Sequence, residues 1–128
     1  MNQTVKEDPV RTHRDGTAFF DSGNYEQAVE RFLEASKLYE NLGDFFDSCY
    51  TLFRAAECSF LLKDYETAAE RFLKAADMAF DKGFDRFGLG ALEYAKDSYE
   101  ASGETKGRNV SSTDQRITEA KEKLSKTF

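Results

Sequence analysis

Residues 25–35 read Tyr-Glu-Gln-Ala-Val-Glu-Arg-Phe-Leu-Glu-Ala, and residues 65–75 read Tyr-Glu-Thr-Ala-Ala-Glu-Arg-Phe-Leu-Lys-Ala. Eight of the eleven positions are identical, and the two stretches are offset by 40 residues. A repeat at a fixed period of this length indicates an architecture of stacked, equivalent units. These near-copies therefore decide the fold class, and we expect the flanking segments to extend the same stack.

Both copies have the apolar spacing of an amphipathic helix. Tyr25, Ala28, Val29 and Phe32 recur at three- and four-residue intervals in the first copy, and the second copy keeps the pattern. This spacing places them on one helix face, which must be buried against another element. Because one helix pair cannot bury such a face alone, the sequence predicts a stack of pairs.

Each repeated helix has a predicted start and stop. Asn24 and Asp64 precede the two helices at the N-cap position, where a side-chain oxygen accepts a hydrogen bond from a free backbone N–H. Gln27 is placed to complete a capping-box-like exchange with Asn24. Gly43 and Gly83 follow the last periodic residues, where a left-handed residue would end the helix.

The intervening segments are also predicted to be helical, because apolar residues recur along 45–62 and, more weakly, along 84–101. Gly88 and Gly90 indicate either a frayed first turn or a close approach by another helix. The last helix is expected to open with a capping-box pattern at residues 112–115. We expect an all-α chain of about six helices, at 9–22, 24–42, 44–62, 64–82, 84–102 and 112–127.

The domain organisation follows from these helices. We predict a disordered lead over residues 1–8 and a single domain over residues 9–128. The domain would hold repeats at 9–42 and 44–82, then a degenerate third repeat at 84–127 with a polar loop at 103–111.

Composition removes several function classes. The chain has 128 residues, a net charge of −6 and a pI of about 4.9, which argue against a dominant nucleic-acid-binding face. No apolar run is long enough to span a membrane, and the first eight residues lack the apolar core of a secretory signal. Cys49 and Cys58 lie about 180° apart on one predicted helix. We therefore expect no disulfide and a cytoplasmic location.

No catalytic or metal-binding motif is present. Cys58 and His13 are the only candidate nucleophile–base pair, and no supporting motif surrounds them. His13 is the sole histidine, so a di-iron site with paired Glu-x-x-His motifs cannot form. We expect no enzyme activity, no cofactor and no metal.

The repeats resemble the tetratricopeptide repeat family over residues 9–103. The first repeat carries the family pattern at Gly16, Phe19, Phe20, Gly23-Asn24-Tyr25, Ala28, Phe32 and Ala35. The second carries it at Ala56, Phe60, Lys63-Asp64-Tyr65, Ala68, Phe72 and Ala75. The third keeps half of it, at Leu92, Ala95, Tyr99 and Gly103. The period of 40, against 34 for the common repeat, is similar to the long-helix repeats of the soluble NSF attachment protein group.

The resemblance implies a right-handed stack of antiparallel helix hairpins, capped by the C-terminal helix, with a concave groove lined by the first helix of each pair. Carried over by position, the groove would hold His13, Thr17, Phe20, Phe53, Arg54, Glu57, Phe60, Glu93, Tyr94 and Asp97. Some family members bind a peptide's terminal carboxylate with Lys and Asn where this chain has His13 and Thr17, so we expect no such clamp. In the alternative interpretation, Phe53 and Phe60 are core residues between repeats. The acidic residues Glu57, Glu93 and Asp97 then form only a solvent-exposed face.

The leading hypothesis is a protein–protein interaction module for a basic or amphipathic partner segment, because the groove mixes aromatic and acidic residues. A self-assembling adaptor of the attachment-protein type, forming a homo-oligomer, is the second hypothesis. A small helical-bundle enzyme is a remote third. Residues 106–128 carry a net charge of +3, which indicates either docking of the last helix on the acidic stack or a weak patch for an anionic partner. No nucleic-acid partner is expected.

Overall fold

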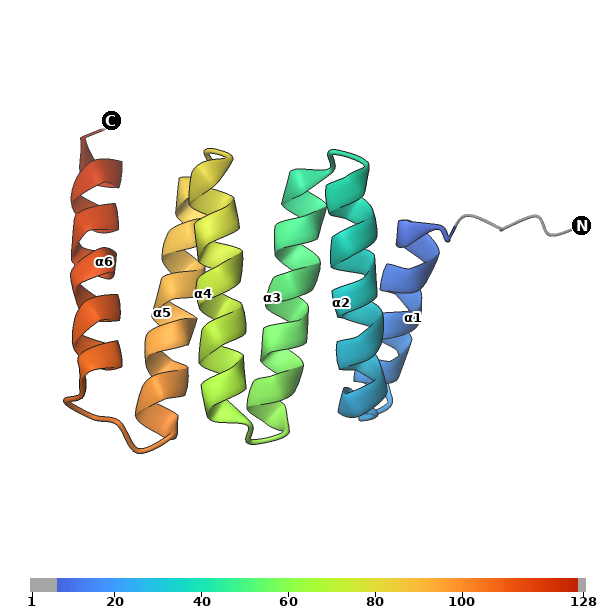
Figure 1. Ribbon diagram of the computed structural model, residues 1–128, viewed down its shortest axis with the longest axis horizontal. Helices are drawn as coiled ribbons and strands as arrows, with labels where there is room; N and C mark the ends of the chain where they lie inside the picture. The colour runs from blue at the N-terminus through green and yellow to red at the C-terminus, as the bar shows by residue number, and fades with distance from the viewer. Residues whose placement is uncertain (1–6, 127–128) are drawn as a thin grey trace, which may run out of the picture.

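Six α-helices make up most of residues 7–126, the part of the chain that the computed structural model describes (Figure 1). They are α1 (Pro9–Asp21), α2 (Tyr25–Asn41), α3 (Phe45–Leu61), α4 (Tyr65–Asp81), α5 (Asp85–Ala101) and α6 (Arg108–Ser125). No strand occurs in this part of the chain, so the predicted all-α class is confirmed. The helices stand side by side in a row, and each runs antiparallel to the next (Figure 1).

The helices form two layers. In Figure 1, α2 and α4 lie in front of α1 and α5. The odd layer (α1, α3 and α5) is held together by contacts such as Arg54 over Phe20 and Phe53 against Tyr94. In the even layer (α2, α4 and α6), an ion pair joins α6 to α4. Contacts within each layer and between consecutive helices define a stack of helix hairpins.

Short turns recur every 20 residues, which explains the 40-residue period of the hairpins. In the second turn, the Gly43 N–H donates to the carbonyl of Glu40 (3.0 Å) and the Asp44 N–H to that of Tyr39 (2.9 Å). These two bonds form a Schellman motif, which needs a left-handed residue after the helix. Glycine takes that position at residues 23, 43, 83 and 103, with φ between 81° and 104°, and Lys63 takes it with a φ of 64°.

The predicted side-chain caps at Asn24 and Asp64 are wrong, although both residues occupy the N-cap position. Neither side chain makes a cap hydrogen bond, and Gln27 completes no exchange with Asn24. The backbone explains this, because each N-cap residue also closes the preceding Schellman motif, with a ψ of 68° or 71°. Asp8 follows no helix in the described chain and has an extended ψ of 116°, and its carboxylate does cap α1 by accepting from the Val10 N–H.

The predicted start of the last helix is also wrong. α6 begins at Arg108, so residues 112–115 lie inside the helix and form no capping box. The Glu104 carboxylate in the preceding loop caps the helix instead, accepting from the Val110 N–H at 2.8 Å and from the Asn109 side chain at 3.1 Å. An anionic group is favoured at a helix N-terminus, where N–H groups lack intrahelical partners.

Small residues and aromatic rings fill the space between the layers, as the repeat predicts. Ala28 and Ala68 are fully buried, and Phe32 and Phe72 are at most 1% exposed. Gly88 marks a close helix approach rather than a frayed turn, because a Cβ there would come within 2.8 Å of the Phe80 ring. Cys49 and Cys58, which the sequence predicts to form no disulfide, are both free and buried in α3.

The disordered lead falls mostly on residues 1–6, which lie outside the described residues, as do residues 127–128. None of the helices in the described range is long and apolar enough to cross a membrane.

Candidate peptide-binding groove

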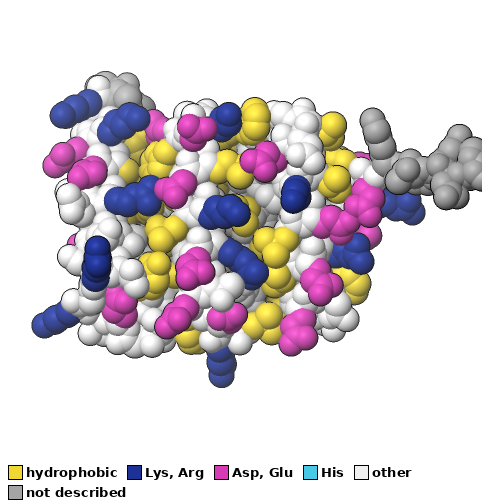
Figure 2. All heavy atoms as spheres, viewed as in Figure 1, with side chains coloured by type: hydrophobic (Ala, Val, Ile, Leu, Met, Phe, Trp, Pro, Cys, Tyr) yellow, Lys and Arg dark blue, Asp and Glu magenta, His cyan; other side chains and the backbone are white. Residues whose placement is uncertain are grey.

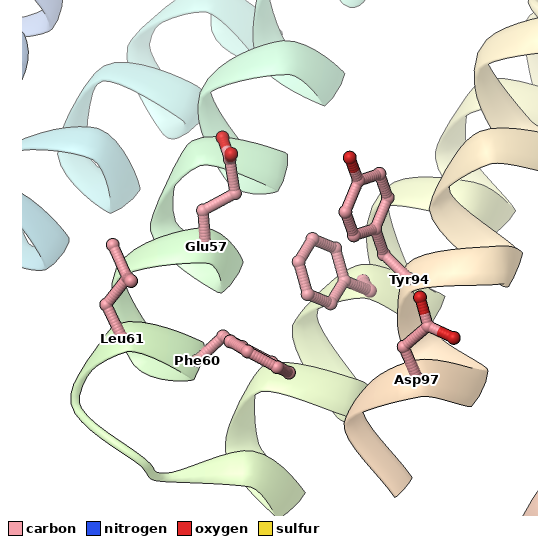
Figure 3. Close-up of a pocket in the computed structure, with 6 residues that line it drawn as sticks. Glu57, Phe60, Leu61, Tyr94 and Asp97 are labelled. Carbon is pink, nitrogen blue, oxygen red and sulfur yellow. The ribbon is translucent and has the colours of Figure 1, made fainter. Parts of the chain in front are cut away.

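A hollow of about 190 Å³ opens in the odd layer between α3 and α5, with α4 beneath it (Figure 3). Glu57 and Leu61 line it from one side and Tyr94 and Asp97 from the other, with Phe60 at its lower edge in Figure 3. We call it the α3–α5 hollow; its lining residues are Glu57, Phe60, Leu61, Phe72, Tyr94 and Asp97. Four of the ten predicted groove residues are therefore brought together here.

Aromatic rings form the floor and one wall of the α3–α5 hollow. The Tyr94 ring stacks on the buried Phe72 ring, with centroids 5.4 Å apart and planes 25° apart. Phe53 lies edge-on to both rings, at 5.0 Å from Phe72 and 5.2 Å from Tyr94. Phe60 packs against Tyr65 at 5.0 Å. Tyr94 nevertheless remains 50% exposed, so the hollow presents an aromatic surface to solvent.

Two carboxylates border this aromatic surface. Glu57 accepts a hydrogen bond from the Arg54 guanidinium at 3.0 Å. Asp97 is exposed and makes no hydrogen bond or ion pair with any residue between 7 and 126. The hollow therefore combines an apolar floor with an exposed carboxylate that forms no ion pair in the described chain, an arrangement that favours a cationic, amphipathic group.

The other predicted groove residues of the first repeat lie at the α1–α3 junction, which is filled. The Arg54 guanidinium carbon lies 4.1 Å from the Phe20 ring centroid and 5.2 Å from that of Phe32. His13 packs against the Phe32 ring, and its Nδ1 is 3.2 Å from the Tyr39 hydroxyl. Thr17 donates to the His13 carbonyl within its own helix. The chain's own side chains occupy this junction.

Burial lowers the pKa of His13 below its usual value, and the neighbouring Arg54 acts in the same direction. Asp47 opposes the shift and does not overcome it. The half-buried ring therefore favours the neutral form, which suits its contacts with Phe32 and the Tyr39 hydroxyl.

Two predicted residues lie beside the α3–α5 hollow rather than in its lining. Phe53 is packed beneath Tyr94 and acts as inter-repeat core. Glu93 pairs with Lys121 of α6 at 4.0 Å, so it faces the last helix. Leu61 and Phe72 were not predicted for the groove. Phe72 occupies a core position on α4, the second helix of its repeat. It forms the floor of the hollow only because α3 and α5, the first helices of two successive repeats, leave a gap above it.

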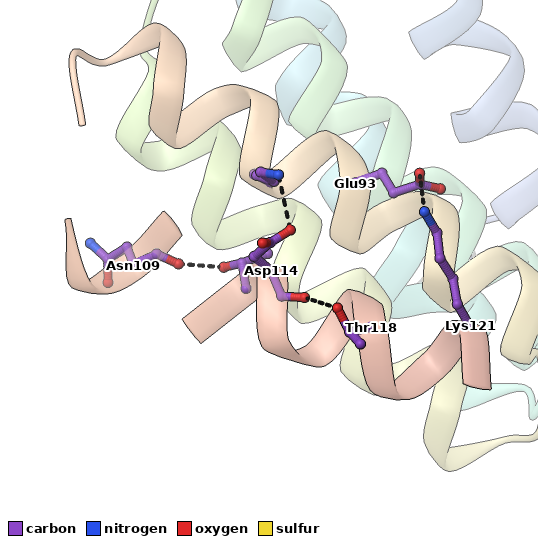
Figure 4. A network of polar contacts seen from close by, with 7 residues as sticks. Glu93, Asn109, Asp114, Thr118 and Lys121 are labelled. Carbon is purple, nitrogen blue, oxygen red and sulfur yellow. Dashed lines mark hydrogen bonds and ion pairs between the residues drawn. The ribbon is translucent and has the colours of Figure 1, made fainter. Parts of the chain in front are cut away.

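The positive charge of α6 is largely paired within the chain. Figure 4 shows Lys121 of α6 reaching Glu93 of α5. The acidic Asp114 of α6 in turn accepts a hydrogen bond from Lys96 of α5. Arg116 donates to Asp77 of α4 at 2.6 Å, and Lys123 lies 3.5 Å from Asp85. Figure 2 shows acidic and basic side chains intermixed over the face formed by α2, α4 and α6. These contacts favour docking of the last helix on the acidic stack over a patch for an anionic partner.

Cys49 and Cys58 are poor nucleophiles, because burial raises the pKa of each thiol to about 11. Cys58 packs in an apolar cluster with Ala28, Phe32 and Ala55. No group of three metal-ligating side chains occurs among residues 7–126.

Comparison with known proteins adds no relative, because no family model, curated protein or solved structure matches this chain.

Proposed function

We propose that this chain is a non-catalytic protein–protein interaction module of the tetratricopeptide-repeat kind, which binds a basic or amphipathic partner segment along its odd layer. The observation that carries the proposal is the α3–α5 hollow, where aromatic rings and an unpaired carboxylate meet in an open concavity. Peptide-binding surfaces commonly combine aromatic anchors with a polar rim. The location we propose is a reducing compartment such as the cytoplasm, which suits two free cysteines buried in one helix.

Charge supports a basic partner over an acidic one. The chain carries a net charge of −6, and three cations of α6 are already paired with α4 and α5. Asp97 therefore adds to a negative surface beside the hollow, which would attract cationic segments and repel anionic ones.

The test is a peptide-display selection on the full chain, followed by fluorescence-polarisation titration of each enriched peptide. The informative variant is Asp97→Lys, because Asp97 is exposed and its substitution breaks no hydrogen bond or ion pair of the described chain. We expect it to weaken binding roughly tenfold or more by replacing attraction with repulsion. The matched control is Glu30→Lys on α2, an exposed residue of the even layer, which should bind like the wild type.

Phe53 is unsuitable for this test, since its truncation would remove core contacts with Phe72 and Tyr94. Enriched peptides that bind wild type and Asp97→Lys equally would contradict the proposed site. Light scattering at several concentrations provides the second measurement. A concentration-dependent oligomer, with no peptide enriched, would favour the self-assembling adaptor instead.

A further inference from the structure

The α1–α3 junction and the α3–α5 hollow are built from residues at equivalent positions of successive repeats. The contacts in the first junction therefore indicate what the second could bind. The 40-residue offset relates Phe20 to Phe60, Phe32 to Phe72, Arg54 to Tyr94, and Glu57 to Asp97. Both junctions therefore have two phenylalanine rings and a carboxylate in corresponding places. Among these four pairs, the charge differs at one position, where the first junction has an arginine and the second a tyrosine. The offset also relates His13 to Phe53 and Thr17 to Glu57, so the second hollow has an additional carboxylate.

At the α1–α3 junction, the chain's own arginine occupies the aromatic surface. The Arg54 guanidinium lies over Phe20 at 4.1 Å and is paired with Glu57 three residues along the helix at 3.0 Å. Its side chain is only 16% exposed, so the cation is largely removed from water. A cation over an aromatic face is most stabilising when it is desolvated and paired with a carboxylate in this way.

At the α3–α5 hollow, the equivalent cation is missing. Tyr94 covers Phe72, as Arg54 covers Phe32, and its ring supplies no positive charge. Within residues 7–126, no arginine or lysine lies over the Phe60 ring, and Asp97 has no ion-pair partner. Phe60 and Asp97 are the equivalents of the ring and the carboxylate that hold the guanidinium in the first junction. Both line the α3–α5 hollow, where a guanidinium from another molecule can reach them (Figure 3).

We propose that the α3–α5 hollow binds the guanidinium of an arginine side chain from the partner, placed over Phe60 and paired with Asp97. This inference rests on the proposed peptide-binding function and specifies the residue that the groove recognises. Arginine is favoured over lysine because its planar, weakly hydrated head stacks on aromatic rings while donating to a carboxylate. The flanking rings of Tyr94 and Phe72 supply apolar surface for the arginine methylene groups.

The experiment uses N-acetyl-arginine-amide as probe, titrated into the full chain while backbone amide resonances are followed by NMR. We expect chemical-shift changes at Phe60, Leu61 and Asp97, and none at the filled α1–α3 junction. The uncharged isostere N-acetyl-citrulline-amide should bind roughly tenfold more weakly, and the lysine analogue should fall between the two. Equal shifts from the arginine and citrulline probes would overturn the proposal.

Two variants test the assigned contacts. Asp97→Asn should weaken binding of the arginine probe by roughly threefold or more, whereas Glu30→Gln on the even layer should leave it unchanged. Tyr94→Arg places a guanidinium of the chain itself where Arg54 lies in the first junction, with Asp97 three residues on. It should abolish probe binding while the fold, followed by circular dichroism, is retained. Undiminished probe binding by folded Tyr94→Arg would contradict the proposal.

The outcomes separate this inference from the function on which it rests. If selected peptides bind in an Asp97-dependent manner while the arginine probe does not bind the hollow, the arginine site is wrong and the groove stands. If the probe binds the hollow as described and no peptide is enriched, the arginine site stands and the peptide-binding function is wrong.

Discussion

Two glycines within one turn of α5 have different surroundings and therefore different effects on stability. A Cβ at Gly88 would come within 2.8 Å of the Phe80 ring, whereas a Cβ at Gly90 would meet nothing within 4 Å. Gly88 therefore permits the close packing of α4 and α5. Gly90 makes no comparable contact and carries the entropic cost of glycine in a helix.

Alanine substitutions at these two positions should have opposite effects. Gly88→Ala should lower the free energy of unfolding by about 1–3 kcal/mol, because the half-buried Phe80 ring must move. Gly90→Ala should raise it by about 0.5–1 kcal/mol, by restricting the unfolded chain and improving helix propensity. Urea denaturation of both variants measures the difference, and a destabilised Gly90→Ala would show that the surrounding space is filled.

His13 links the first junction to pH. The fold lowers the pKa of His13 and so favours the neutral ring, whereas the unfolded chain takes up its proton near pH 6.5. The neutral His13 ring therefore contributes fully to the stability of the fold above about pH 6.5. This contribution is lost as the pH falls through the lower pKa that His13 has in the folded state. We expect the melting temperature to decrease between about pH 7.5 and about pH 5.5.

The control for this pH dependence is His13→Phe, which copies Phe53 at the equivalent position of the next repeat. Because His13 is the only histidine, the variant should have a flatter melting-temperature profile over the same range. An unchanged profile would mean that carboxylates, and not His13, cause the decrease.

The sequence predicts helix boundaries well where apolar spacing and a turn residue set them. It fails at the start of α6, where a side chain of the preceding loop sets the boundary. Five helices end within one residue of their predicted limits. After four of them a glycine such as Gly43 ends the apolar pattern and adopts a left-handed φ, and after α3 Lys63 does so. The start of α6 could not be found this way, since its capping carboxylate, Glu104, lies four residues before the helix begins. Its loop position matches no capping-box spacing.

A buried polar contact holds α2 against α3. The Ser36 hydroxyl donates to the Ser48 carbonyl at 2.8 Å, and the Ser48 hydroxyl donates to the Ser36 carbonyl at 2.7 Å. Both side chains are buried, so these bonds form away from water. The equivalent positions in the next repeat hold Ala76 and Gly88, where the same approach is apolar.

A double-mutant cycle should detect this contact. Ser36→Ala and Ser48→Ala should each cost about 0.5–1.5 kcal/mol in the free energy of unfolding. The double variant should cost less than the sum by about 0.5–1 kcal/mol, because each substitution already disrupts the reciprocal pair. Urea denaturation of the four proteins measures the coupling. Strictly additive effects would show that the two hydroxyls act independently.

The whole molecule determines which predicted groove residues are brought together. Four residues predicted from their position in the repeat line one hollow, namely Glu57, Phe60, Tyr94 and Asp97. Repeat position alone could not show that this hollow is open while the first junction is filled. The difference depends on the residue that covers the rings, which is the cation Arg54 in the first junction and the uncharged Tyr94 in the second. Repeat position also could not place Glu93, whose orientation depends on a partner in α6. A groove in a stack is thus defined by differences between repeats as much as by their likeness.

The linear order of the stack also determines how the molecule opens. Each helix packs mainly on its sequence neighbours, so α1 and α6 lie at the ends and α3 lies between packed neighbours. In such arrays, end units open at a lower free-energy cost than internal ones. Cys49 and Cys58 are both fully buried in α3, which makes them natural probes of opening at the centre.

Thiol labelling should therefore report unfolding of the central repeats. With a pKa of about 11, each native thiol is only about 0.1% thiolate at pH 8, whereas an unfolded cysteine is about one quarter thiolate. We expect Ellman's reagent to label the native chain at least about 100-fold more slowly than the urea-unfolded chain. The variants Cys49→Ala and Cys58→Ala resolve the two sites, which should react at similar rates because exposure of either requires α3 to separate from its neighbours. Rapid labelling of one site in native buffer would show that α3 opens locally, and that the centre of the stack is no more stable than its ends.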